Sequence, residues 1–237
     1  MGRMKTPFVA GYDTSFAVIY KPPNMHTVPL SADGGKNTLL HWCAGLFPGV
    51  LAAQGRKPVE GGAVHRLDYC TEGLVLFALT AKTFAFFSAE QKEGRFEKEY
   101  RAITWNKPVY PPAGFPPTDK APMDEKAPFD IESGFRAYGP GAKTVRPVSV
   151  NAGQSVYRTR ILNIEKGEGE TFRWRVMLTR GFRHQIRCHL AWIGYPICGD
   201  TLYGGGKIDT EYDFFGLCAV SLRFNHPDTG KPVYVRL

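Results

Sequence analysis

The sequence predicts an α+β fold in which strands outnumber helices. Short runs rich in β-branched and aromatic residues recur along the chain, and several alternate between apolar and polar positions, as strands do. Three other segments carry apolar residues at helical spacing and end near glycine or proline. We expect strands at 16–20, 74–79, 96–105, 156–164, 171–180, 216–224 and 233–237, and helices at 38–51, 80–92 and 182–193.

Glycine and proline residues separate these elements. Prolines follow Lys21 and end the first strand, and Lys166-Gly167-Glu168-Gly169 predicts a hairpin turn. The segment 106–129 has prolines at 108, 111, 112, 116, 117, 122 and 128, so we expect a long surface excursion there. We expect turns in the basic stretch 134–147. Apolar patterns resume beyond the excursion, which favours a single domain that spans residues 1–237.

The bulk composition is that of an ordinary globular chain. The 237 residues are 43% hydrophobic and 22% charged, and no apolar stretch reaches the roughly 18 residues of a membrane span. The first residues lack the apolar core of a signal peptide. The five cysteines (43, 70, 188, 198 and 218) are odd in number and form no C-x-x-C pair. We therefore expect reduced thiols and a cytoplasmic location.

The charge of the chain points to a polyanionic partner. Its net charge is +8, and residues 156–187 contain eight basic side chains against three acidic ones. Nucleic acid is the first partner that such a balance suggests. A well-solvated basic face is the alternative, and charge alone does not separate the two.

The segment from His65 to Gly73 carries the candidate nucleophile, Asp68. It is a polar loop that leads into an apolar strand, where a fold can hold side chains rigidly at the edge of a cleft. A guanidinium such as that of Arg66 lowers the pKa of a carboxylate within a few ångströms by about 1–3 units, which suits a nucleophile better than a general acid. The alternative is that Asp68 caps a turn or pairs with Arg66 for stability.

Two long motifs resemble signatures of the RluA-type pseudouridine synthases. The first is His65-Arg66-Leu67-Asp68-x-x-Thr71-x-Gly73-Leu74, and the second is His184-Gln185-Ile186-Arg187-x-His189-Leu190-Ala191-x-x-Gly194-x-Pro196-Ile197-x-Gly199-Asp200-x-Leu202-Tyr203-Gly204. Supporting matches are Lys21-Pro22, Lys98-x-Tyr100-x-Ala102 and His226-Pro227. They occur in the family's order, and the resemblance runs from about Phe16 to the C-terminus.

The resemblance implies an enzyme that isomerises uridine in ribosomal or transfer RNA without a cofactor or metal. Asp68 would be the nucleophile, Tyr100 would lie against the base and remove the C5 proton, and Arg187 would pair with Asp68. The residues implied in RNA or substrate binding are His65, Arg66, Leu67, Thr71, Arg183, His184, Gln185, Ile186, Leu202 and Tyr203. The implied fold is a long, mixed, mostly antiparallel sheet with flanking helices and a central catalytic cleft. We expect a monomer without the S4-type N-terminal RNA-binding domain of many relatives.

Two departures from the family pattern concern substrate contacts. Glu72 replaces the usual serine, and Phe182 stands where the family has an arginine, with Arg183 one position later. Because of these departures, the motifs do not identify which RNA is the substrate.

Other functions fit the sequence less well. His184 and His189 are five residues apart, which is the wrong spacing for metal ligands on one helical face, and we expect them and His65 to be structural. The glycines at 204–206 lack P-loop spacing, and Asp68 has no evident second carboxylate for glycoside hydrolysis. The alternative from another class is a non-catalytic RNA-binding or RNA-folding protein on the same scaffold.

Overall fold

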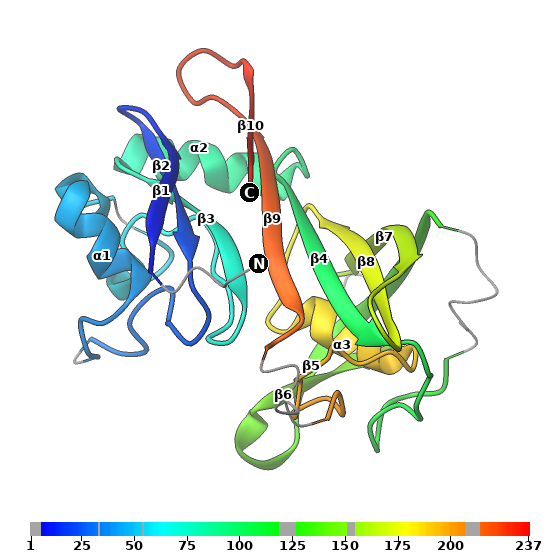
Figure 1. The fold of residues 1–237 in the computed structure, drawn as a ribbon. Coiled ribbons are helices and arrows are strands. Elements are labelled where there is room, and N and C mark those ends of the chain that lie inside the picture. Colours follow the sequence, from blue (N-terminus) through cyan, green and yellow to red (C-terminus); the bar gives the residue numbers. More distant parts are fainter. Residues whose placement is uncertain (1–5, 33, 54, 119–126, 151–154, 207–213) are drawn as a thin grey trace. The chain divides into compact units, whose positions relative to one another are not determined.

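The computed structural model describes residues 6–32, 34–53, 55–118, 127–150, 155–206 and 214–237. The chain forms two compact units, of which one comprises residues 1–98 and 218–237 and the other residues 99–217. Each contains strands and helices, which confirms the predicted α+β class (Figure 1). No helix among the described residues is both long and apolar enough to cross a membrane.

The first unit is a mixed sheet with two α-helices. Its strands are β1 (Phe8–Tyr12), β2 (Phe16–Lys21), β3 (Glu72–Ala78), β9 (Leu217–Asn225) and β10 (Pro232–Arg236), in the order β1-β2-β3-β9 with β10 on β9. All these pairs are antiparallel except β3 with β9. The helices are α1 (Leu39–Leu46) and α2 (Ala81–Lys92), and 3-10 turns cover Pro48–Leu51 and Pro58–Glu60.

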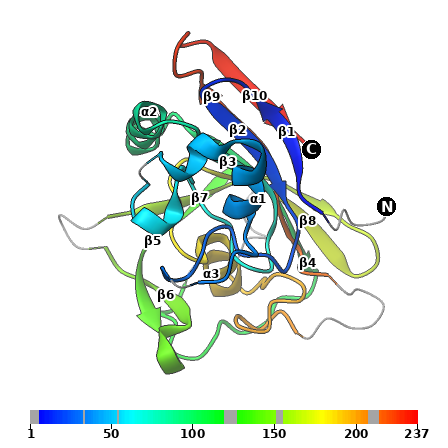
Figure 2. The ribbon, with the colours of Figure 1, turned by 90° about the vertical axis from the view of Figure 1, so that its left-hand side faces the viewer.

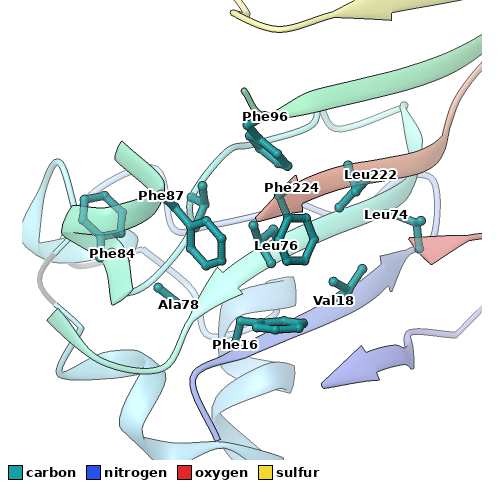
Figure 3. Packing of buried hydrophobic residues seen from close by; sticks show 11 residues of the cluster. Phe16, Val18, Leu74, Leu76, Ala78, Phe84, Phe87, Phe96, Leu222 and Phe224 are labelled. Carbon is teal, nitrogen blue, oxygen red and sulfur yellow. The ribbon is translucent and has the colours of Figure 1, made fainter. Parts of the chain in front are cut away.

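One face of this sheet packs on α2 through an aromatic core. Figure 3 shows Phe84 and Phe87 of α2 beside Phe16 of β2 and Phe224 of β9. The rings of Phe87 and Phe224 meet edge to face at 5.3 Å, a favourable geometry for aromatic pairs. Every residue of β2 is buried, so the opposite face of the strand is covered as well.

The two helix starts in the first unit follow from their capping residues. The hydroxyls of Thr38 and Thr80 accept the N–H groups of His41 and Thr83, which satisfies otherwise unpaired donors in the first turn. Gly94, with φ of 72°, ends the second helix as predicted. The helix expected over 38–51 is shorter, because Pro48 follows α1 and the chain continues as a 3-10 turn.

The second unit is built on a five-strand path and one α-helix. Its strands are β4 (Glu97–Trp105, which begins in the first unit), β5 (Phe129–Tyr138), β6 (Thr144–Val148), β7 (Tyr157–Lys166) and β8 (Thr171–Leu178), in the order β4-β8-β7-β5-β6. The pairs β5–β6, β5–β7 and β7–β8 are antiparallel. Figure 2 shows the helix α3 (Gln185–Trp192) close to the β6 hairpin.

Two strand predictions were incomplete. The stretch 134–147 was expected to be turns, but β5 and β6 pair across it from Gly134↔Val148 to Tyr138↔Thr144. Only Pro140–Ala142 forms the turn, beside Gly139 at φ of 73°. The strand β1 was not predicted. Residues 106–118 contain no helix or strand, as expected for the proline-rich segment, whose residues 119–126 lie outside the described part.

Candidate active site

Buried hydrogen bonds fix the loop that carries Asp68. The Thr27 hydroxyl donates to the Leu67 carbonyl (3.0 Å) and accepts the Leu67 N–H (3.1 Å), and Thr27 and Leu67 are both buried. The Thr71 N–H donates to the Asp68 carbonyl (3.1 Å) and closes a turn. Asp68, half-buried, therefore lies between a clamped residue and a closed turn.

Lys21 lies under the same loop with its charge enclosed. Its Nζ donates to the carbonyls of Pro22 (2.9 Å), Met25 (2.8 Å) and Tyr69 (3.1 Å), which matches the three donors of an ammonium group. Burial lowers the pKa of Lys21 to about 8, and the charges of Cys70 and Asp68 partly oppose that shift. Lys21 is thus a cation close enough to interact electrostatically with the candidate nucleophile.

Arg66, suggested by the sequence as a cation beside Asp68, pairs with Glu60 in the structure. Its guanidinium pairs with Glu60 at 3.0 Å, and its side chain is 56% exposed. Glu60 is buried, and a buried carboxylate without a cationic partner costs more free energy than a solvated one. Nearness in sequence did not show that Glu60 would be a partner of the Arg66 guanidinium.

The strand that follows the loop is held by His65 and Gly73. Nε2 of His65 accepts the Leu76 N–H (3.2 Å), and burial lowers the pKa of His65 well below its ordinary value. The neutral imidazole is thus engaged in a structural bond. Gly73 has φ of 122°, and a Cβ there would lie 2.3 Å from the carbonyl oxygen of Ala219 on β9. Only glycine permits this approach of β3 and β9.

In the second unit, Arg187 forms a buried, two-pronged ion pair with Asp200. The Nε–Oδ2 and Nη2–Oδ1 distances are 2.7 and 2.9 Å, and the two side chains are 4% and 1% exposed. The guanidinium also lies over the rings of Tyr203 and Phe215 at 5.3 and 5.2 Å. This arrangement fixes the plane of the guanidinium.

Tyr203 joins α3 to the β5–β6 hairpin. Its hydroxyl accepts the Val145 N–H (2.8 Å) and bonds Nδ1 of His184 (3.1 Å), and burial raises its pKa. Leu202 beside it is 47% exposed, and its N–H donates to Asp200. Tyr203 and Leu202 were predicted to contact substrate; the first is buried within the unit and the second is accessible.

Helix α3 begins later than predicted. His184 has φ of 57°, a left-handed conformation, so the helix starts at Gln185 and not at Phe182. The Gln185 side chain accepts the Phe182 N–H and donates to the Arg158 carbonyl and the Thr159 hydroxyl. Arg183 therefore precedes the helix, and the expectation that it shares a helical stripe with Arg187 was wrong. Its guanidinium instead donates to the carbonyls of Ala142 and Thr144.

Tyr100 and Ile186 are both buried side chains of the second unit. Along β4, Lys98, Tyr100 and Ala102 are buried, and Arg101 between them is exposed, which confirms the predicted face. His189, proposed and discounted as a metal ligand, bonds the hydroxyls of Ser133 and Thr159. Among the described residues, no three His, Cys, Asp or Glu side chains gather as a metal site would require.

The structure thus assembles the predicted residues in two groups, one within each unit. His65, Leu67, Asp68 and Thr71 belong to the first, and Tyr100, Ile186, Arg187 and Tyr203 to the second. Sequence reasoning missed Thr27, Lys21 and Asp200 as supports of the site. Lys21 and Asp200 stood inside the quoted motifs, so their positions were visible, whereas nothing in the sequence distinguished Thr27.

Comparison with known proteins identifies the family of the chain. The family model for RNA pseudouridylate synthase matches residues 15–192, which include the Asp68 loop, β4 and the whole of α3. The chain belongs to this family. The matched relatives include members of its RluA-type branch.

Curated relatives cover the chain to different extents. The dual-specificity RNA pseudouridine synthase RluA of Yersinia pestis is 24% identical over 94% of this chain and 95% of its own length. The tRNA pseudouridine synthase C of Vibrio cholerae is 30% identical over 73% of this chain and 70% of its own length. The uncharacterized RNA pseudouridine synthase YjbO of Bacillus subtilis is 30% identical over 70% of this chain, which spans about half (51%) of that protein.

Solved structures agree on the fold. Human RNA pseudouridylate synthase domain containing 4 superposes with a TM-score of 0.64 at 18% identity, covering 97% of this chain and 87% of that one. Human RNA pseudouridylate synthase domain containing 1 also gives 0.64, at 19% identity, covering 100% and 85%. The chain has the pseudouridine synthase fold.

Proposed function

We propose that this protein isomerises one or more uridines of a structured RNA to pseudouridine, with Asp68 as the nucleophile. The observation that carries the proposal is the rigid presentation of Asp68. Thr27 clamps the preceding residue, the Asp68–Thr71 turn follows, and Lys21 is enclosed beneath. Such preorganisation keeps a nucleophile in its reactive position without reorganisation during the reaction.

The chemistry follows from a carboxylate in that position. Asp68 attacks the uracil ring or the anomeric carbon of the ribose, the N-glycosidic bond breaks, and the base turns over. A bond then forms between C5 and the ribose, and the bond between Asp68 and the nucleoside breaks, which restores the carboxylate. Tyr100 removes the C5 proton, and N1 of the turned base takes up a proton. The overall reaction is an isomerisation, so its balance requires no oxidant, water or group donor.

Arg187 is the second charged group in the proposal. Asp200 holds its guanidinium in one plane through two hydrogen bonds. In the proposed mechanism Arg187 orients the Asp68 carboxylate, and Ile186 lines the base pocket.

The substrate must be turned out of its helix or loop before Asp68 reaches it. Base flipping costs a few kcal/mol, and contacts of basic side chains with flanking phosphates offset part of that cost. Arg66 is exposed and belongs to the same loop as Asp68, so it is suited to fill the space that the base leaves. Arg183 is exposed at the β5–β6 turn and is a candidate phosphate contact.

The names of the relatives bear on the RNA class. Those proteins include synthases of the ribosomal large subunit and of tRNA, and we propose a target among these two classes. A monomer in the cytoplasm, where cysteines stay reduced, fits the proposal.

Tritium release tests the activity. Total RNA labelled with tritium at uracil C5, from cells lacking this gene, is incubated with the wild type or with Asp68→Ala. Isomerisation exchanges the C5 hydrogen, so we expect release with the wild type and none with the variant. Equal release from both proteins would reject Asp68 as the nucleophile, and no release from either would favour the non-catalytic RNA-binding alternative.

A further inference from the structure

We infer that Tyr69 is a stacking platform for the RNA base next to the flipped uridine. The inference rests on the proposed function, because it takes Asp68 as the site of reaction. Tyr69 directly follows Asp68 and is 48% exposed, which is unusual for an aromatic side chain on a tightly bonded loop. Burial in a core therefore does not explain this residue.

Hydrogen bonds hold the Tyr69 backbone, and one aromatic contact holds its ring. The Tyr69 carbonyl accepts hydrogen bonds from Lys21 Nζ (3.1 Å) and from the Met25 N–H (3.3 Å), which holds its backbone. The imidazole of His26 packs against the ring, with centroids 4.7 Å apart and planes tilted by 47°. His26 is itself anchored, because its carbonyl accepts the Leu39 N–H at the start of α1.

This support leaves part of the ring open to solvent. A ring that is held in place and half exposed loses little conformational entropy when a ligand stacks on it. Consecutive Cα atoms lie about 3.8 Å apart, so a nucleotide whose sugar or base meets Asp68 brings its neighbour close to Tyr69. The ligand that fits a flat exposed ring on a basic protein is a nucleic-acid base.

The platform addresses the cost of base flipping. When the target uridine leaves the stack, the neighbouring base loses a stacking partner, and an aromatic ring of the protein can replace it. Stacking does not depend on the identity of the base, so the platform stabilises the opened RNA without defining its sequence. Tyr69 is thus proposed as a substrate-binding residue and not as a participant in the chemistry.

The test compares Tyr69→Phe with Tyr69→Leu. Phenylalanine keeps the flat ring, whereas leucine fills similar volume against His26 but cannot stack. The probe is a fluorescein-labelled nine-nucleotide RNA with a central uridine and 2-aminopurine beside it, because 2-aminopurine fluorescence falls on stacking. We expect the wild type and Tyr69→Phe to bind with quenching, and Tyr69→Leu to bind about tenfold more weakly without it. Thermal unfolding checks that Tyr69→Leu remains folded.

The outcomes separate this inference from the proposed activity. Equal affinity and quenching for Tyr69→Phe and Tyr69→Leu, or binding of the wild type without quenching, would overturn the platform. Failure of the wild type to bind the probe at low salt would also overturn it. Tritium release is measured in parallel on the labelled total RNA. Ring-dependent quenching without release from the wild type would uphold the platform and reject the isomerase.

Discussion

A single buried hydroxyl positions the residue beside the nucleophile. The Thr27→Val variant removes both bonds to Leu67 and leaves a buried N–H without its partner, which costs about 1–3 kcal/mol of unfolding free energy. A loosened Asp68 loop should also lower kcat for tritium release by about tenfold with little change in KM. Thr27→Ser restores the hydroxyl and should recover kcat. A Thr27→Val enzyme with wild-type kcat would show that the clamp is structural only.

Lys98 is a buried cation with a pH signature of its own. Among the described residues its Nζ has no ion pair and lies over the Phe96 ring at 5.1 Å, and burial lowers its pKa to about 8. The unfolded chain keeps that proton until about pH 10.5, so between pH 8 and 10.5 it binds more protons than the folded protein. Lys98 should therefore make the unfolding free energy rise with pH across this window.

The Lys98→Met variant removes the buried charge. At pH 7 we expect the unfolding free energy of the variant to exceed that of the wild type by on the order of 2–3 kcal/mol. Most of this difference should disappear by pH 10. Urea titrations at several pH values measure the difference. A difference that stays constant with pH would contradict the lowered pKa of Lys98.

At the scale of elements, the Arg187–Asp200 pair joins α3 to the loop that follows it. Asp200→Leu removes the carboxylate that pairs with the buried guanidinium and should cost about 3–5 kcal/mol of stability. The double variant Arg187→Met with Asp200→Leu contains no buried charge at this position and should recover much of that loss. If Arg187 acts on the reaction, the recovered double variant still releases no tritium. A stable double variant with normal release would limit Arg187 to a structural role.

Elements whose signals were local could be predicted from the sequence. Thr80 and Gly94 bound α2 as expected, because a cap and a positive-φ glycine act within a few residues. The β5–β6 hairpin was missed, because Gly139, Pro140 and Gly141 resemble an irregular segment although they occupy only its turn. The late start of α3 depends on the contacts of His184 and Gln185 with distant residues, and no local rule contains those contacts.

The sequence motifs name the candidate catalytic residues, which remain a prediction, and they do not reveal several residues that support these positions. Asp68, Tyr100 and Arg187 stand in the family signatures, and the structure gives them rigid or buried positions. The partner of Arg66 could not be predicted, because Glu60 lies in a separate 3-10 turn that only the fold brings close. Thr27 is 40 residues from Leu67, a separation across which a single sequence carries no pairing signal.

At the scale of the whole molecule, the net charge of +8 should make RNA binding depend on salt. Each phosphate contact releases a condensed counterion, so three to five contacts predict a loss of roughly 20-fold to 500-fold in affinity between 50 and 200 mM salt. Tritium release at subsaturating RNA should fall in parallel, through KM and not through kcat. An affinity that is independent of salt would contradict a substrate held by its phosphates.

The most direct measurement of the central claim is a map of pseudouridines in RNA from cells that lack this gene. The cells are complemented with the wild type or with Asp68→Asn at matched protein levels. Asparagine preserves the size of the side chain but removes the negative charge of the nucleophile. If Asp68 is the nucleophile, one or more ribosomal or transfer RNA positions regain pseudouridine with the wild type and remain uridine with the variant. Restoration of the same positions by Asp68→Asn would contradict the role of Asp68 as the nucleophile.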